Sequence, residues 1–341
     1  MIVEIEKSGI NATLCKNRII VCKIRNSRLK AKQTAILEML FTQYDNEIQY
    51  IKNGPLGDVQ GLISFLCPNE KFESFVKRLY GAGYCEKFYI LNFDDISDES
   101  NINLNSINPQ IWKGRKFSVN PLYSQDSKIY EEQSPHNREF RIIGNDGEIK
   151  SIHGYRGDGT EYGRRSLPVE DARCMVNLSM HFQNTKMIDP FAGGGGILYA
   201  FRYIVSEGEM TSADNDPVLK PSLEFYGSRH YTINSAEASF PQNCFDSIIT
   251  ETPFSINAMP DITAALTRLC GSLTDNGAAV IMCGPDQYTE ISQTLEKIPL
   301  YRIFDQKIDR KGTNIIISVW NKSREFMLEM ERHISVLRKI F

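Results

Sequence analysis

The chain has 341 residues, of which 41% are hydrophobic and 24% are charged, and its formal net charge at pH 7 is -3. This length exceeds a single common core and predicts about two domains. The slightly acidic balance is unlike the basic composition that non-specific nucleic-acid binding favours. The eight cysteines form no C-x-x-C pair and the five histidines are scattered, so we expect reduced core thiols and no metal site.

The N-terminus shows no basic-then-apolar signal, and no apolar run reaches the length of a membrane span. We therefore expect a cytoplasmic protein without a membrane partner. The sequence leaves the oligomeric state open.

The first half of the chain predicts a small α+β accessory domain, which we place at residues 1–100. Strand-like and helix-like segments follow one another at 19–24, 32–44, 48–51, 61–66, 72–80 and 88–91. In this order they form β-α-β-β-α-β, the pattern of a ferredoxin-like sandwich. A linker and connecting region follows at 101–160. Between Lys7 and Glu38 the chain has eight Lys and Arg residues and no acid, a stretch able to neutralise phosphates.

Residues 161–341 predict a second domain of the α/β class. Helices are expected at 170–182, 197–205, 217–227 and 260–273, strands at 186–188, 245–250 and 278–282, and a hairpin at 301–320 that turns at Lys311-Gly312. An amphipathic helix closes the chain, with apolar residues at steps of three and four from Met327 to Phe341. Alternating strands and helices imply a doubly wound sheet whose ligand crevice lies at the strand carboxyl ends.

A ligand loop is predicted where the strand at 186–188 ends. The chain there reads Ile-Asp-Pro-Phe-Ala-Gly-Gly-Gly-Gly-Ile from Ile188 to Ile197. Glycines let backbone N-H groups approach a ligand at a sharp turn, and a helix follows at once. The run is neither G-x-G-x-x-G nor a P-loop, which disfavours a dinucleotide or a triphosphate. A structural glycine turn without a ligand is the alternative.

This string resembles motif I of the class I S-adenosylmethionine methyltransferases, in the subgroup that modifies exocyclic amines of nucleic-acid bases. The resemblance implies a Rossmann-like sheet and S-adenosyl-L-methionine as the cofactor. It assigns the methionine half of that cofactor to Asp189, Pro190, Phe191, Ala192, Gly193 and Gly195. It assigns the ribose to the acid that ends the next strand, Asp214, with Asn215 beside it and Asp216 as the fallback.

A second motif, Thr250 to Ser255, follows the strand at 245–250 at the place where the family has Asp-Pro-Pro-Tyr or Asn-Pro-Pro-Tyr. The resemblance makes Glu251, Pro253 and Phe254 catalytic: a carboxylate that accepts a hydrogen bond from the amine, a rigid turn, and a ring that stacks on the base. Glu is one methylene longer than Asp, and Thr252 replaces the first proline. An ordinary Thr-Pro turn is the alternative.

Two further segments complete the resemblance. Ser235 and Ala236 occupy the place where relatives bind the adenine, although a loop serine in water explains Ser235 equally well. Upstream of motif I, the chain resembles the guanine exocyclic-amine (N2) methyltransferases of tRNA and rRNA, which makes Arg156, Arg164 and Arg165 candidate substrate contacts. A solvated face neutralised by neighbouring acids is the alternative for these arginines.

The predicted function is therefore an N-methyltransferase that acts on an exocyclic amine, with guanine in structured RNA, tRNA or rRNA, as the leading acceptor. The protein would then take part in RNA modification and tRNA processing. A non-nucleic amine acceptor, or an inactive adaptor that binds the cofactor or RNA, remain alternatives.

Overall fold

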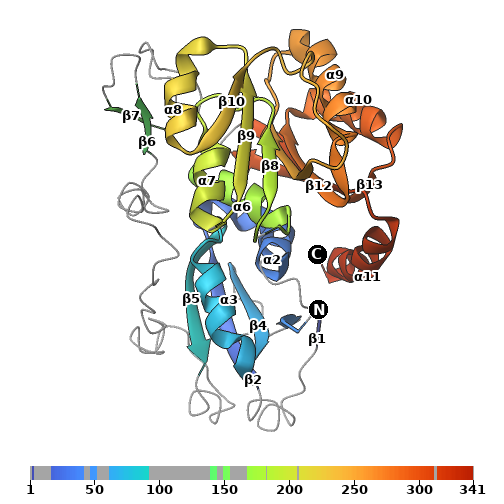
Figure 1. Cartoon of the computed structure of the whole chain (residues 1–341). Coiled ribbons are helices and arrows are strands. Elements are labelled where there is room, and N and C mark those ends of the chain that lie inside the picture. The colour runs from blue at the N-terminus through green and yellow to red at the C-terminus, as the bar shows by residue number, and fades with distance from the viewer. Residues whose placement is uncertain are drawn as a thin grey trace. The chain divides into compact units, whose positions relative to one another are not determined.

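The computed structural model describes residues 2–3, 17–41, 47–51, 61–91, 139–143, 149–153, 167–181, 183–205, 207–310 and 313–340 (Figure 1). The chain divides into two compact units, one made of Met1–Leu122 with Arg332–Phe341 and the other of Tyr123–Glu331. The sequence predicts a second domain that runs to the C-terminus, whereas the last ten residues group with the first unit. The predicted boundaries at 100 and 160 lie outside the described residues.

The first unit contains a five-stranded sheet in the order β1-β3-β4-β2-β5. Its elements are β1 (Ile2–Val3), β2 (Asn17–Ile24), η2 (Asn26–Ala31), α2 (Lys32–Phe41), β3 (Gln49–Ile51), β4 (Leu62–Pro68), η3 (Asn69–Lys71), α3 (Phe72–Leu79) and β5 (Cys85–Leu91). β4 runs antiparallel to both β2 and β3, and β5 runs antiparallel to β2. From β2 onward this is a split β-α-β-β-α-β arrangement.

The core of the first unit forms because β4 and α3 each place aromatic side chains on their inner face. Phe65 and Phe75 are fully buried, and their rings meet edge to face with centroids 5.8 Å apart. Tyr50 of β3 meets Phe65 in the same way at 6.1 Å. Such edge-to-face pairs add to the free energy gained by burying the rings. β1, which pairs in parallel with β3, was not predicted.

The second unit is built on a seven-stranded sheet in the order β10-β9-β8-β11-β12-β14-β13. Its strands are β8 (Lys186–Asp189), β9 (Glu209–Asp214), β10 (Ser228–Thr232), β11 (Phe245–Glu251), β12 (Leu273–Cys283), β13 (Tyr301–Arg310) and β14 (Thr313–Asn321). The first five strands in the sheet order are parallel, and β14 is antiparallel to β12 and β13. The predicted doubly wound α/β fold with an antiparallel end hairpin is thus confirmed, and its strand order reverses between β8 and β11.

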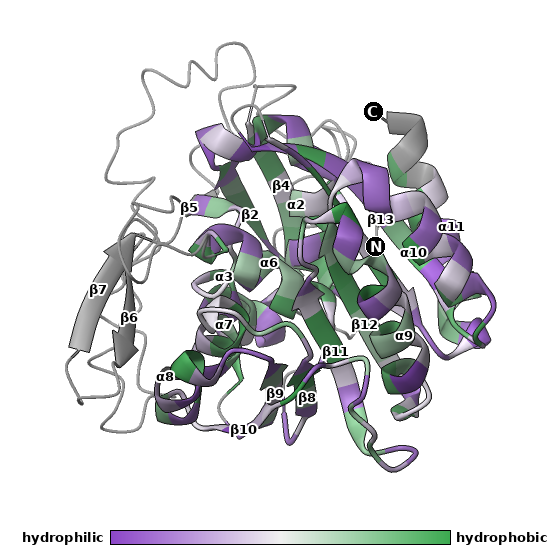
Figure 2. Ribbon diagram, turned by 90° about the horizontal axis from the view of Figure 1, so that it is seen from above, coloured by the Kyte–Doolittle hydropathy of each residue, from purple (hydrophilic) through white to green (hydrophobic). Residues whose placement is uncertain are grey.

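Helices cover both faces of this sheet (Figures 1 and 2). The helices of this half of the chain are α6 (Val169–Leu178), α7 (Gly196–Ile204), η5 (Pro217–Leu219), α8 (Lys220–Phe225), η6 (Ile256–Ala258), α9 (Met259–Cys270), α10 (Pro285–Glu296) and α11 (Arg324–Ile340), the last of which groups with the first unit from Arg332 onward. α6, α7 and α8 lie on one face, and α9 and α10 lie on the other. α9 packs Ile262, Leu266 and Leu269 on Ile248 and Ile281 of the sheet, and all five side chains are fully buried.

Hydropathy explains why the parallel strands form the centre of the unit. Green predominates along β12 in Figure 2, and every residue of this strand from Gly277 to Cys283 is buried. Strands buried on both faces are characteristic of parallel sheets. A separate hairpin of β6 (Glu139–Ile143) and β7 (Ile149–His153) also belongs to the second unit.

Of the cysteines that the structure describes, Cys22, Cys67, Cys85, Cys174, Cys270 and Cys283 are buried, as expected. Burial raises the pKa of the Cys270 and Cys283 thiols to about 12, so both remain protonated at neutral pH. Within the described ranges, no helix combines the length and apolar character needed to cross a bilayer.

Candidate functional site

The second unit has a cavity of about 420 Å³ at the carboxyl ends of β8, β9 and β11. Ligands of doubly wound sheets bind at such a point, where the strand order reverses. Two segments form most of its wall: the glycine loop (residues 189–196) after β8, and the Glu251 loop (residues 251–255) after β11. Residues after β9 and β10, together with Leu167, Ile197 and the segment from Ala258 to Ile262, contribute the rest of the lining. Among the described residues, no group of three or more His, Cys, Asp and Glu side chains is placed to hold a metal ion.

The glycine loop turns sharply because two of its glycines adopt a backbone conformation that L side chains rarely enter. The φ angle is 48° at Gly193 and 81° at Gly195. The Gly195 N-H donates to the Ala192 carbonyl at 2.8 Å, which closes the turn directly before α7 begins. The loop therefore directs the N-terminal end of α7 toward the cavity, an arrangement that favours polar or anionic ligand groups.

Asp214, at the end of β9, ties the glycine loop to its neighbouring strand. Its Oδ2 accepts the Gly193 N-H at 2.9 Å, and its Oδ1 accepts the Asp216 N-H at 2.9 Å. Asp214 and Asn215 line the cavity. Asp216 does not line it, and instead caps η5 by accepting the Val218 N-H at 2.9 Å. The geometry thus favours Asp214 over Asp216 as a residue that contacts a ligand.

Asp189 is the buried carboxylate of the site, with 1% of its surface exposed. Its Oδ1 accepts the Thr250 hydroxyl at 2.7 Å and the Phe191 N-H at 3.2 Å. Desolvation by burial raises the pKa of Asp189 to about 7, against the smaller lowering effect of these two hydrogen bonds. At neutral pH this carboxyl group is therefore divided between its protonated and ionised forms.

The segment after β10 packs against the glycine loop. The Ser235 hydroxyl donates to the Pro190 carbonyl, and Ser235 is 3% exposed. The Ala236 N-H donates to Asn234 Oδ1 at 3.0 Å, which fixes the turn. Ser235 is therefore not a loop serine in water.

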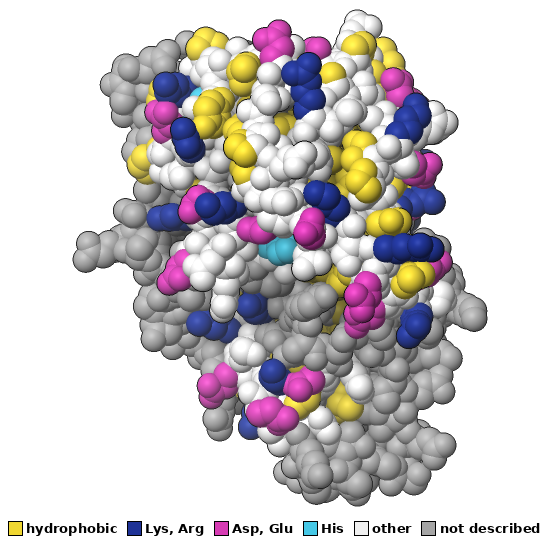
Figure 3. All heavy atoms as spheres, turned by 45° about the vertical axis from the view of Figure 1, so that its right-hand side comes forward, with side chains coloured by type: hydrophobic (Ala, Val, Ile, Leu, Met, Phe, Trp, Pro, Cys, Tyr) yellow, Lys and Arg dark blue, Asp and Glu magenta, His cyan; other side chains and the backbone are white. Residues whose placement is uncertain are grey.

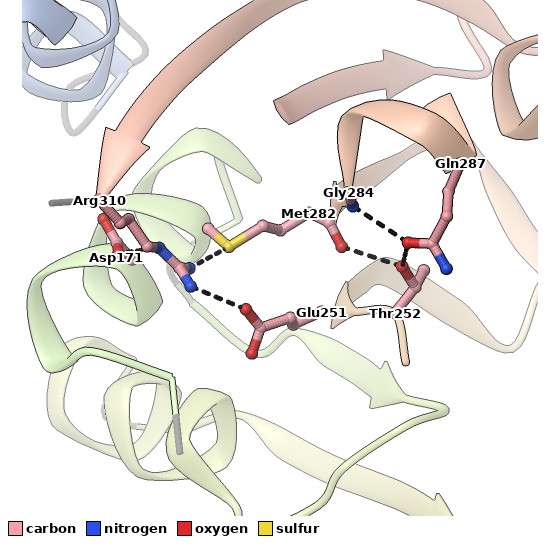
Figure 4. Close-up of polar contacts among 7 residues, drawn as sticks. All are labelled: Asp171, Glu251, Thr252, Met282, Gly284, Gln287 and Arg310. Carbon is pink, nitrogen blue, oxygen red and sulfur yellow. Dashed lines mark hydrogen bonds and ion pairs between the residues drawn. The ribbon is translucent and has the colours of Figure 1, made fainter. Parts of the chain in front are cut away.

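The Glu251 loop is held from α10, a helix that the sequence did not predict (Figure 4). Gln287 Nε2 donates to the Pro253 carbonyl at 2.6 Å, and Gln287 Oε1 accepts the Gly284 N-H at 3.0 Å. The Thr252 side chain is buried and its hydroxyl lies 3.3 Å from the Met282 carbonyl oxygen. Thr252, which replaces the first proline of the family motif, thus fixes the turn by hydrogen bonds instead of by a ring.

Glu251 takes part in a chain of charges that no motif indicated (Figure 4). Its Oε1 accepts a hydrogen bond from Arg310 Nη1 at 3.0 Å. Arg310 Nε lies 2.8 Å from Asp171 Oδ2 of α6, an ion-pair distance without the alignment of a hydrogen bond at that atom. Arg310 Nη2 also contacts the Met282 sulfur. We call Asp171, Arg310 and Glu251 the charge triad.

Most of the predicted site residues lie together in this cavity. Its lining includes Asp189, Pro190, Phe191, Ala192, Gly193, Asp214, Asn215, Ser235, Glu251, Pro253 and Phe254. Gly195 and Ala236 do not line it, and a Cβ at Gly195 would lie 3.0 Å from Leu223 and Tyr226, so that this glycine serves the packing of the turn. Arg156, Arg164 and Arg165 lie outside the described residues.

Gly194 and Gly196, which belong to the predicted glycine run, also line the cavity. Sequence reasoning missed several other lining residues: Leu167, Ile197, Asn234, Thr252, Ala258, Asp261 and Ile262. Thr252 stands within the second motif. Asp261 belongs to the first turn of α9, where an acid is favoured by the helix dipole whether or not a ligand is present.

Neither a protein-family model nor a curated protein matches this chain. Solved structures resemble it over part of its length. A TehB-like SAM-dependent methyltransferase from Corynebacterium glutamicum is 19% identical, with 44% of this chain and 87% of that chain covered and a TM-score of 0.36. A putative RNA methyltransferase from Pyrococcus horikoshii is 16% identical, with 46% and 85% covered and a TM-score of 0.38.

A third similar structure is the N-methyltransferase NodS from Bradyrhizobium japonicum in complex with S-adenosyl-L-homocysteine. It is 11% identical, with 48% of this chain and 89% of that chain covered and a TM-score of 0.39. Identities below 20% and TM-scores below 0.4 leave the function of this chain to be derived from its own site.

Proposed function

We propose that this protein is an S-adenosylmethionine-dependent N-methyltransferase that acts on an exocyclic amine. One observation supports this most strongly. The glycine loop and the Glu251 loop, which carry the two sequence motifs, line a single cavity where the strand order of the sheet reverses. A volume of about 420 Å³ is within the range of small-molecule and cofactor sites.

The residues of the cavity suit each part of the cofactor. The backbone of the glycine loop would hold the methionine half, and Asp214 with Asn215 would hold the ribose hydroxyls. Asn234 and Ser235 would lie at the adenine. The cofactor supplies a methyl group made electrophilic by the positive sulfonium.

The protein would contribute mainly by positioning the acceptor. Transfer of that methyl group to the acceptor nitrogen would leave neutral S-adenosylhomocysteine, and the methylated nitrogen would give up one proton. Glu251 would accept a hydrogen bond from the amine, and Phe254, which is 37% exposed, offers a ring for stacking at the cavity mouth.

Guanine in structured RNA is the acceptor that we place first, because of the resemblance to the guanine N2 methyltransferases and the basic stretch in the first unit. Only part of this basic stretch lies on the surface of the first unit. Arg18 and Lys30 are exposed, whereas Arg25 and Arg28 are buried and Arg25 Nε donates to the Gly83 carbonyl at 2.6 Å. On the face shown in Figure 3, basic and acidic side chains are interspersed, with no single stripe of one sign.

A small non-nucleic amine is the second candidate, and the charge of the cavity favours it. Four carboxylic acids line the cavity, Asp189, Asp214, Glu251 and Asp261, and its described lining contains no Lys, Arg or His. Such a wall suits a neutral or cationic acceptor better than a phosphate backbone. An adaptor that binds the cofactor without catalysis is the remaining alternative.

Transfer of a tritiated methyl group from S-adenosylmethionine to an acceptor panel tests the proposal. The panel holds unmodified tRNA transcripts, an rRNA transcript, and small primary and aromatic amines. We expect incorporation into one class, lost in Glu251→Gln and kept in Glu290→Gln, whose side chain is exposed on α10. Cofactor binding without transfer to any acceptor would support the adaptor instead.

A further inference from the structure

The charge triad is more enclosed than an ordinary surface ion pair. The side chains of Asp171, Arg310 and Glu251 are 0%, 7% and 17% exposed, respectively. Such a buried carboxylate and guanidinium each lose hydration, so the partners must offset that loss by close contact. Removing Arg310 would take away the guanidinium that lies 2.8 Å from the enclosed Asp171 carboxylate.

The three side chains come from separate elements that meet beside the cavity. Asp171 lies in the first turn of α6, Glu251 ends β11, and Arg310 is the last residue of β13. From Lys307 to Arg310 of β13, exposed and buried side chains alternate, so that Arg310 stands on the same side as the buried Ile308. A strand position that ordinarily takes an apolar side chain therefore carries a guanidinium that contacts the Glu251 loop.

We propose that Arg310 is a positioning residue that fixes and partly neutralises the Glu251 carboxylate at the cavity wall. This inference rests on the proposed function of the site. Glu251 has one more rotatable bond than the Asp of the family motif, and the Arg310 contact at 3.0 Å restrains that freedom. Asp171 in turn holds the guanidinium in place. Within the triad, two carboxylates thus share one guanidinium.

Two readouts separate this role from a merely structural one. The first needs no acceptor: S-adenosylmethionine carries a sulfonium charge, whereas S-adenosylhomocysteine is neutral. Loss of Arg310 removes one positive charge from beside the cavity, which favours the cation. We expect Arg310→Met to raise the affinity ratio of the first ligand to the second by about 3- to 10-fold, measured by calorimetry. Arg310→Lys should retain most of the wild-type ratio.

The second readout is the rate of transfer to the acceptor that the panel identifies. In Arg310→Met we expect kcat to fall about 10- to 100-fold while KM changes less, with partial recovery in Arg310→Lys. Arg268→Met, at an exposed position of α9, is the matched control and should resemble the wild type. Where Arg310→Met does not fold, Asp171→Asn loosens the guanidinium from its other side and should reduce kcat in the same direction.

The outcomes distinguish the two proposals. Failure of the wild type to bind S-adenosylmethionine would overturn the proposed function. Binding by the wild type, with an unchanged affinity ratio in Arg310→Met, would overturn the role of Arg310 alone. A loss of thermal stability with the wild-type ratio and kcat would show that the triad is structural.

Discussion

The two walls of the cavity are built in different ways. The glycine loop is local: one continuous run ends β8, turns on glycines with positive φ, and begins α7. The Glu251 loop depends on distant residues instead. Its geometry is held by Gln287, 34 positions from Pro253, and by Arg310, 59 positions from Glu251. The sequence motif predicts the geometry of the glycine loop because that geometry depends on local backbone conformation. It predicts the geometry of the Glu251 loop only in part, because that geometry depends on side chains far away in the sequence.

This difference also explains how the departures from the family motif fit the structure. Thr252 lacks the ring of a proline, and hydrogen bonds from α10 and β12 fix the turn instead. Glu251 is longer than an Asp, and an arginine restrains it. Each departure is accompanied by a contact from another element of the second unit.

The largest effect is expected from Gly195→Val in the local wall. The φ of 81° is strained for any β-branched residue, and the new Cβ would lie 3.0 Å from Leu223 and Tyr226. Strain of this kind costs about 1–3 kcal/mol, to which the clash adds. We expect lower stability in denaturant unfolding and loss of S-adenosylmethionine binding. Gly194→Ala, in the same loop but without a positive φ, should unfold close to the wild type. An equal free energy of unfolding in the two variants would contradict the importance of the positive φ at Gly195.

Gln287→Ala tests the wall built from distant residues. It removes the donor to the Pro253 carbonyl and the acceptor of the Gly284 N-H, at a cost of about 1–3 kcal/mol. We expect slower methyl transfer with nearly unchanged cofactor affinity, since the glycine loop does not depend on α10. Gln293→Ala, at an exposed position of the same helix, should change neither quantity. If Gln287→Ala lowered the cofactor affinity as much as it lowered the transfer rate, the two walls of the cavity would depend on each other.

Asp189→Asn gives the most pH-specific effect, which for each pH unit is the smallest of the three. The native pKa of about 7 lies above the unfolded value near 3.8, so the native state keeps a proton that the unfolded state has lost between these values. The unfolding free energy therefore falls as pH rises through this window, by at most about 1.4 kcal/mol per pH unit, and levels off above pH 7. An Asn, which mimics the protonated acid, removes this slope. Unfolding at pH 5, 6, 7 and 8 measures it, with the exposed Asp275→Asn as control. If the unfolding free energy of Asp189→Asn still fell with pH in this window, the raised pKa would not belong to Asp189.

The sequence predicted β8, β11 and β12 of the second unit because their apolar runs are bounded by turn residues and helices. It also placed the glycine run directly after a strand, and in the structure this run lines the cavity. It missed α10 because Pro285 to Glu296 has few apolar residues, and only Ile291 and Leu295 of that helix enter the core cluster. It missed the role of Arg310 because a buried ion pair between strands and helices leaves no local pattern. The one available signal was an arginine two positions after Ile308 in an alternating strand.

Calorimetric titration with S-adenosylmethionine shows whether the cavity is a cofactor site. It compares the wild type with Asp214→Ala and with Asp216→Ala as the matched control. We expect binding by the wild type, at least tenfold weaker binding in Asp214→Ala, and near wild-type binding in Asp216→Ala, because Asp214 lines the cavity and holds the glycine loop whereas Asp216 does neither. No binding by folded wild-type protein free of copurified cofactor, or equal binding by both variants, would contradict this expectation.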